Sequence, residues 1–328
     1  LTDSRGLLEV NEEIEMSFAW PTTQQAHYRV MRLRRLIAFT VVIPMAVVMT
    51  IALMDPAALS AANATLASLG IAALVVGHVV LFPNVTLETI ALSLSATFLV
   101  ILMPLIKVLS LWAPVEQASG AFVILLGFAV AVMGVAMALF QIILGALVYA
   151  GPAVRKTLNT TLFVPCSPTV AFQQFALRPQ SRRGRVLTGP VDENGFFDVA
   201  VAVSGFSDGE GIYAPQVVKL DAKVLSSSAD RHDVMMVLRN GSVTVTSQKF
   251  VATKEGCDVQ VCDMPGDFTV GMHALFWLTD QQADNLTETA DSLIGQVGRT
   301  NGMAHNASLM AVAGTILSPR APVSNHTE

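Results

Sequence analysis

Few residues of this chain have the types and spacing that acid–base chemistry requires. Asp230, His232 and Asp233 place two carboxylates beside an imidazole, a combination used in general acid–base catalysis. They precede a strand-like run, so we expect a solvated turn there and not an active site. The sequence contains no Gly-x-Ser-x-Gly elbow, His-Glu-x-x-His helix or phosphate-binding loop. These observations favour a protein that is not an enzyme and that uses no cofactor.

The three cysteines offer neither a metal site nor a disulfide framework. Cys257 and Cys262 lie in one predicted strand, where alternation turns their side chains to opposite faces, and Cys166 is far away in sequence. No cluster of histidines supports a metal site either. An odd, low count of cysteines fits a reducing compartment for this half of the chain.

One local basic patch stands out in the C-terminal half, which is otherwise acidic. Its members are Arg178, Arg182, Arg183 and Arg185. Facing the cytosol, such a patch would bind anionic lipid head groups, RNA or an acidic protein. The alternative is an ordinary solvated loop. The net charge of −5 argues against a globally basic nucleic-acid binder.

Two parts of very different composition must position these residues. The chain has 328 residues and a mean hydropathy of +0.55, with 14% charged residues against about 25% in soluble domains. Between Leu36 and Ala150 the only acids and bases are Asp55, Glu88, Lys107 and Glu116. We therefore predict an α-helical polytopic membrane domain at 36–150, with spans at about 36–54, 65–82, 89–112 and 120–150. Within the second span, His78 is either part of a proton path or a packed, neutral side chain.

The last span carries a stripe of small residues along one helix face. Its members are Gly120, Gly127, Ala131, Gly134, Ala138 and Gly145. Small residues let helix backbones approach closely in lipid, so the stripe predicts a packing seam, either within the chain or between the protomers of a homodimer. The alternative is chance, because Gly and Ala are common in membrane helices.

Basic residues flank one side of the predicted membrane domain. Six of them, Arg29, Arg32, Arg34, Arg35, Arg155 and Lys156, place both termini in the cytosol by the positive-inside rule. The polar segment 1–35 then precedes the membrane, and the C-terminal domain 151–298 and the tail 299–328 follow it. Seven Asn-x-Ser/Thr triplets occur, of which Asn63 falls on the opposite side, where it would accept a glycan.

After residue 157 the pattern becomes one of short strands. Runs at 160–164, 185–191, 196–203, 216–225, 233–238, 242–252, 257–262 and 268–277 alternate with turn residues, and Asn240-Gly241 predicts a hairpin. Eight strands indicate an all-β, sandwich-like domain or a curled sheet. We expect one helix at 279–297 and a further strand at 309–317.

Several motifs, in order, resemble the endodomain of the membrane (M) protein of coronaviruses and related nidoviruses. They are Ser242-Val-Thr-Val-Thr246, Asp263-Met-Pro265, Phe268-Thr-Val270 and Val297-Gly-Arg-Thr-Asn-Gly302. The resemblance implies a non-enzymatic, dimeric organiser of the virion envelope and of host ER–Golgi membranes. Such a protein recruits spike and nucleocapsid proteins and shapes the budding membrane. The chain departs from that family in having four predicted spans instead of three and an apparent insertion near 180–235.

A second resemblance points to a different class. Val164-Pro-Cys-Ser-Pro-Thr-Val-Ala-Phe172, followed by strands and the helix at 279–297, looks like a START-like helix-grip domain. That fold holds an apolar ligand between a long helix and a curved sheet, which implies a lipid- or quinone-binding protein anchored in a bacterial inner membrane. An ion channel or an accessory subunit of a membrane complex is a third alternative. A helix lying across the sheet favours the binder, and a filled sandwich favours the organiser.

Overall fold

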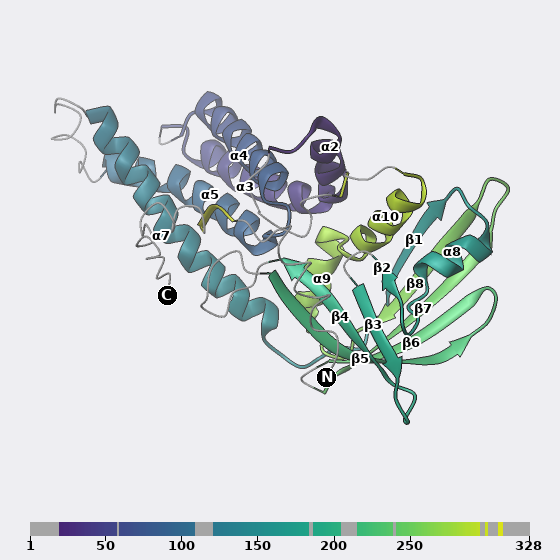
Figure 1. Ribbon diagram of the computed structural model, residues 1–328. Helices are drawn as coiled ribbons and strands as arrows, with labels where there is room; N and C mark the ends of the chain where they lie inside the picture. Colours follow the sequence, from purple (N-terminus) through teal and green to yellow (C-terminus); the bar gives the residue numbers. More distant parts are fainter. Residues whose placement is uncertain are drawn as a thin grey trace, which may run out of the picture.

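The computed structural model describes residues 20–57, 59–108, 121–183, 186–204, 215–238, 241–295, 299–300 and 308–310. It shows a bundle of long N-terminal helices beside a C-terminal antiparallel sheet, with short helices between and against them (Figure 1).

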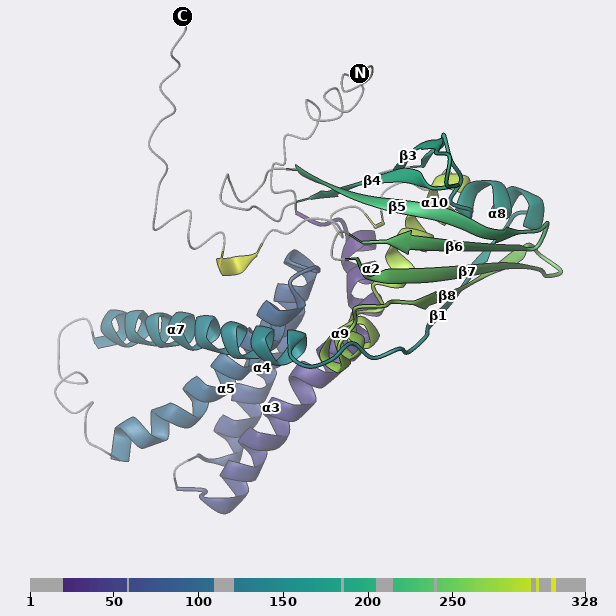
Figure 2. The ribbon, with the colours of Figure 1, turned by 90° about the horizontal axis from the view of Figure 1, so that it is seen from below.

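The bundle contains a short helix followed by four long ones. These are α2 (Thr23–Arg32), α3 (Arg34–Met54), α4 (Ala61–Leu81), α5 (Thr86–Val108) and α7 (Ala121–Tyr149). A capping box between Thr22 and Gln25 begins α2, because each side chain accepts a hydrogen bond from the other residue's backbone N–H. The α4 helix packs against α3 and α5, and α7 packs against α5 (Figure 2).

Three helices of the described chain are long and apolar enough to cross a membrane. They are Arg34–Met54, Ala61–Leu81 and Leu126–Tyr149, and α5 adds a shorter apolar stretch, Thr86–Leu102. The predicted spans 36–54, 65–82, 89–112 and 120–150 therefore fall on α3, α4, α5 and α7, although residues 109–120 lie outside the described part.

The C-terminal domain is built on one eight-stranded antiparallel sheet with the order β1-β8-β7-β6-β5-β4-β3-β2. The strands are β1 (Leu158–Val164), β2 (Arg182–Arg183), β3 (Val186–Val191), β4 (Phe197–Ser204), β5 (Pro215–Ser227), β6 (Arg231–Val237), β7 (Val243–Ala252) and β8 (Cys257–Met264). The first strand pairs with the last, and every other neighbouring pair is consecutive in the chain. The predicted hairpin joins β6 to β7, with Gly241 at a φ of 80°, a left-handed conformation that suits glycine.

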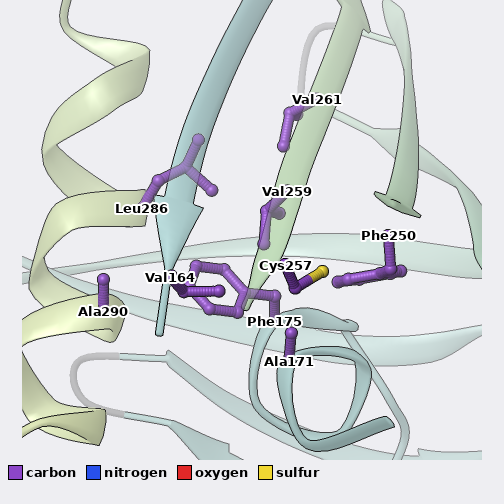
Figure 3. Close-up of a cluster of buried hydrophobic side chains, with 9 residues drawn as sticks. All are labelled: Val164, Ala171, Phe175, Phe250, Cys257, Val259, Val261, Leu286 and Ala290. Carbon is purple, nitrogen blue, oxygen red and sulfur yellow. The ribbon is translucent and has the colours of Figure 1, made fainter. Parts of the chain in front are cut away.

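In the described residues, three helices accompany the sheet: α8 (Pro168–Phe175), α9 (Val270–Thr279) and α10 (Gln282–Leu293). Both α8 and α10 pack on the same face of β1, β7 and β8, which we call the inner face. Their side chains meet those of the strands in a buried apolar cluster (Figure 3). It consists of Val164, Ala171, Phe175, Phe250, Cys257, Val259, Val261, Leu286 and Ala290.

The prediction of an all-β, sandwich-like domain is confirmed only in part. The strands exist, but in the described residues they form one sheet whose inner face is covered by helices and not by a second sheet. Helix α10 supplies that cover with Leu286, Ala290 and Leu293, whose spacing of four and three residues forms one helical stripe.

Two predicted elements in this region differ from the structure. The run 268–277 is not a strand, because the Thr269 side chain accepts a hydrogen bond from the N–H of Met272 and so begins α9. The single helix predicted at 279–297 is shorter, ending at Leu293. A left-handed residue, Asp280 with a φ of 49°, separates it from α9.

Candidate functional site

The inner face of the sheet carries a group of polar side chains among its apolar ones. His232 on β6 pairs with Gln248 on β7, and Thr246 on β7 pairs with Asp263 on β8. Gln248 lies two residues from Phe250, and Asp263 lies two residues from Val261, so strand alternation turns all four polar residues to the inner face. We call these four residues the polar row.

His232 is a buried, neutral member of the polar row and not part of a solvated turn. Its Nε2–H donates to the carbonyl of Leu177 at 2.8 Å, and Nδ1 lies 3.2 Å from the Ser227 hydroxyl, which donates to it. Phe172 of α8 packs edge-on against the ring. Burial lowers the pKa of His232, because a charged imidazole is poorly solvated there. The prediction of a solvated turn failed because β6 begins at Arg231 and draws His232 into the domain.

Asp263 ties the polar row to the start of α10. Its carboxyl group accepts hydrogen bonds from the side chains of Gln282 and Thr246. Gln282 in turn accepts one from the Thr160 hydroxyl on β1, at 2.6 Å. Burial raises the pKa of Asp263, although these hydrogen bonds oppose the rise. Burial thus acts against the charged form of both the carboxyl group and the imidazole.

Two oxygen atoms of the polar row have no hydrogen-bond partner among the described residues. They are Oε1 of Gln248 and Oδ1 of Asp263, and both are fully shielded from solvent. A buried polar atom left unpaired costs on the order of 1–3 kcal/mol, so such atoms usually meet a partner. The pairing register puts the two residues diagonally across β7 and β8, at about 7–8 Å between their Cα atoms.

The opposite side of α10 faces the helical bundle. Asp284 forms a buried ion pair with Arg32 of α2, with 2.9 Å between Arg32 Nε and Asp284 Oδ1. The Tyr28 hydroxyl donates to the same oxygen at 3.0 Å. Burial and the nearby carboxylate raise the pKa of Tyr28, which keeps the phenol protonated and able to donate. One helix is thus held between the polar row and the bundle.

A separate polar cluster lies inside the bundle, at the end nearest the sheet. His78 of α4 lies 2.8 Å from Glu88 of α5, and its other ring nitrogen lies 3.1 Å from the Thr89 hydroxyl. The backbone N–H of Leu309 donates to Glu88 at 2.6 Å. His78 is therefore packed and hydrogen-bonded, which is one of the two alternatives that the sequence left open.

The small-residue stripe of α7 makes no close packing within the described chain. A Cβ added at Gly127, Gly134 or Gly145 would meet no atom within 4 Å, Ala131 is exposed and Ala138 is half-buried. Gly120 lies outside the described residues. Packing of this stripe between protomers stays a prediction.

The other predicted site residues do not join the polar row. Arg178 and Arg182 are exposed, the side chain of Arg183 is not described, and Arg185 lies outside the described residues. Asn63 is exposed in the first turn of α4. Cys166, Cys257 and Cys262 are free thiols. Among the described residues no group of three or more His, Cys, Asp or Glu side chains is placed to hold a metal ion.

The polar row was missed by reading the sequence. Thr246, Gln248 and Phe250 occupy alternate positions of one predicted strand and so face the same side. This alternation is the only sequence signal for Thr246 and Gln248. A polar residue at an inward position is visible only once the inward face is known, and that face is set by α8 and α10.

Neither a family model nor a curated protein matches the chain. Solved structures resemble its C-terminal part. Protein MLL2253 from Mesorhizobium loti is 10% identical, covering 44% of this chain and 99% of its own, with a TM-score of 0.30. The Aha1 dimer from Colwellia psychrerythraea is 12% identical, covering 44% and 99%, with a TM-score of 0.30. Mll3558 from Rhizobium loti is 20% identical, covering 43% and 96%, with a TM-score of 0.29. At these scores the likeness supports no conclusion about function.

Proposed function

We propose that this protein is a non-enzymatic, membrane-anchored binding protein. Its sheet domain would hold a neutral amphipathic molecule of the lipid or quinone class against the inner face, beneath α10. The observation that carries the proposal is the pair of buried, unpartnered oxygens on Gln248 and Asp263. A hydrogen-bond donor on the ligand would supply the partner that each oxygen lacks.

The surroundings of the polar row suit a molecule with one polar end. An apolar cluster that includes Phe250 and Val259 lies on one side, and a second that includes Val234 and Ala222 lies on the other. Such a site binds an apolar body by burial and orients it with a few polar groups. Because burial favours the uncharged forms of His232 and Asp263, a hydroxyl-bearing neutral molecule fits better than an ion.

The helical bundle would anchor this domain by crossing a bilayer. Many large apolar side chains on α3, α4 and α7 are exposed, as expected of helices that face lipid; Leu66, Val135 and Ile142 are examples. We place the sheet domain in the cytosol, because Arg34 begins α3 and Arg155 follows α7, on the side of the bundle where the sheet domain lies. If the protein is a lipid- or quinone-binding protein of the bacterial kind described above, the membrane is a bacterial inner membrane.

A second candidate function is the self-associating envelope organiser that the resemblance to coronavirus M proteins implies. The open small-residue face of α7 favours it, since Gly127, Gly134 and Gly145 leave room for the backbone of another helix. Spike, nucleocapsid and RNA would then be the partners.

Ligand binding by matched variants separates the two functions. The full chain in detergent would be titrated with decylubiquinol, whose hydroxyls can donate hydrogen bonds, and with a fluorescent diacylglycerol. Gln248→Leu removes the polar group on the inner face, and Gln260→Leu makes the same change on β8 at an exposed position. We expect one probe to bind the wild type and Gln260→Leu equally, and Gln248→Leu about tenfold more weakly, which corresponds to about 1.4 kcal/mol.

Equal binding by all three proteins, or binding by none of them, would contradict the proposed site. A crosslinked dimer through α7 in the absence of any binding would support the organiser.

A further inference from the structure

Helix α9 presents an apolar strip to its surroundings. Val270 is 69% exposed, Trp277 is 60% exposed and Ala274 lies exposed between them, at helical spacing. His273 and Leu278, on the two flanks of this strip, are buried, and so is Thr279 behind it. A large apolar side chain in water forgoes roughly 1.5–3 kcal/mol of burial, so this strip needs an apolar environment.

The N-terminal end of α9 is fixed to the end of α7. A Cβ added at Gly271 would lie 2.5 Å from the Cα of Val148, so only glycine permits this approach of the two backbones. The Thr269 hydroxyl donates to the carbonyl of Val148. His273 Nε2–H donates to the carbonyl of Val154, just beyond α7, at 2.9 Å.

The C-terminal end of α9 is fixed to the start of α3. The guanidinium of Arg35 donates to the carbonyl of Trp277 at 2.9 Å and stacks over its indole ring at 5.2 Å from the centroid. Leu275 packs against the buried side chains of Leu33 and Leu36. Arg34, the first residue of α3, is itself exposed.

Helix α9 therefore bridges the same-side ends of two candidate spans. The last residue of α7, Tyr149, is 63% exposed at that level. Exposed Trp and Tyr together with Arg at the ends of apolar helices are typical of the region where lipid head groups meet acyl chains.

We propose that α9 lies in the head-group region of the bilayer as an interfacial anchor, with its partner being phospholipid. Val270, Ala274 and Trp277 face the acyl chains, and Arg34 and Arg35 face the head-group phosphates. The inference rests on the proposed function only in placing α3 and α7 across a membrane. It assigns the sheet domain a fixed distance from the lipid, with α10 close above the bilayer surface.

Tryptophan quenching tests the proposal. The chain has three tryptophans, so Trp20→Phe with Trp112→Phe leaves Trp277 alone in the full-length protein. Reconstituted in phosphatidylcholine vesicles, Trp277 is expected to be quenched by brominated acyl chains and protected from iodide. A Trp-free protein carrying Phe163→Trp, an exposed position on β1, is the control and is expected to show the reverse.

Iodide quenching of Trp277 without quenching by brominated lipid would overturn the inference. Alkaline carbonate extraction distinguishes that result from a failure of the helical bundle to insert in the membrane. A chain that stays in the vesicles after extraction has an inserted bundle, independently of where α9 lies. If the tryptophan variants do not fold, Ala274→Cys in the otherwise native chain replaces them. Peptide mass spectrometry would then read its protection from a water-soluble thiol reagent, and full labelling would overturn the inference.

Discussion

Arg32 in the segment before the first apolar helix forms a buried ion pair with Asp284, on the helix that covers the sheet. The two residues belong to different halves of the chain, and the pair joins those halves. Arginines before an apolar run predict membrane orientation from sequence alone. Here Arg32 also holds the sheet domain to the bundle, and Arg35 does the same through Trp277.

Breaking this pair from one side should be costly. Arg32→Ala leaves the carboxylate of Asp284 buried without its partner, and we expect a loss of about 3–5 kcal/mol in the free energy of unfolding. The double variant with Asp284→Ala should lose less than the sum of the single variants, because no unpaired charge then remains. Thermal unfolding of the full chain in detergent measures both, with Arg34→Ala as an exposed control. Equal effects of Arg32→Ala and Arg34→Ala would contradict the pair's role.

His232 predicts a pH dependence of stability. Its pKa in the folded protein is lowered by burial from an ordinary value of about 6.5. The unfolded chain therefore binds a proton at His232 more readily than the folded chain does. The contribution of His232 to the free energy of unfolding is complete above about pH 6.5 and is lost as the pH falls toward the lowered pKa. His232→Gln should flatten stability between pH 5 and 7 relative to wild type. Parallel curves for the two proteins would show that His232 is not buried as a neutral ring.

Asp263 predicts a dependence of the opposite sign. Its pKa is raised by burial, so the folded state holds a proton that the unfolded state has released. The carboxyl group therefore stabilises the fold below its ordinary pKa, and this contribution is lost as the pH rises through the raised value. Asp263→Asn keeps an acceptor for Gln282 without a charge. We expect the free energy of unfolding of this variant to equal or exceed that of the wild type at pH 7. Near pH 4 we expect it to be no higher than that of the wild type. Destabilisation at pH 7 that disappears near pH 4 would mean that the carboxylate is the native form.

The apolar cluster under α8 and α10 should dominate the stability of the sheet domain. Phe175→Ala removes a side chain that is 1% exposed, and such truncations cost about 3–5 kcal/mol (Figure 3). Phe163→Ala on β1 deletes the same group from a position that is 47% exposed, and it should cost much less. Chemical unfolding followed by circular dichroism compares them. Similar losses for the two variants would show that α8 is not packed on the sheet as described.

Much of the secondary structure follows from sequence because its causes are local. The apolar runs of α3 and α4 lack charges over a membrane's thickness, and the strands β3 to β8 are bounded by turn residues. The run 268–277 misled because Phe268, Val270, Phe276 and Trp277 have high strand propensity. The capping hydroxyl of Thr269 and the contact of Gly271 with α7 decide in favour of a helix.

The candidate site could not be predicted because its causes are not local. Gln248 suggests a binding site only because its side chain faces inward. The inward face is the one that Phe250 and Val259 share with α8 and α10, and the sequence does not show which face that is. From the sequence, Asp284 is indistinguishable from an exposed acid on a helix surface, because its partner Arg32 is far away in the chain.

The proposed function requires that a neutral amphiphile lies on the inner face of the sheet. Photolabelling tests it most directly: a diacylglycerol with a diazirine in its glycerol-proximal segment would be added to the full chain in vesicles, and labelled peptides mapped by mass spectrometry. We expect labels at Thr246–Gln248 and at Asp263, weakened by Gln248→Leu. Labels confined to the exposed faces of α3, α4 and α7, with none on β7 or β8, would contradict it.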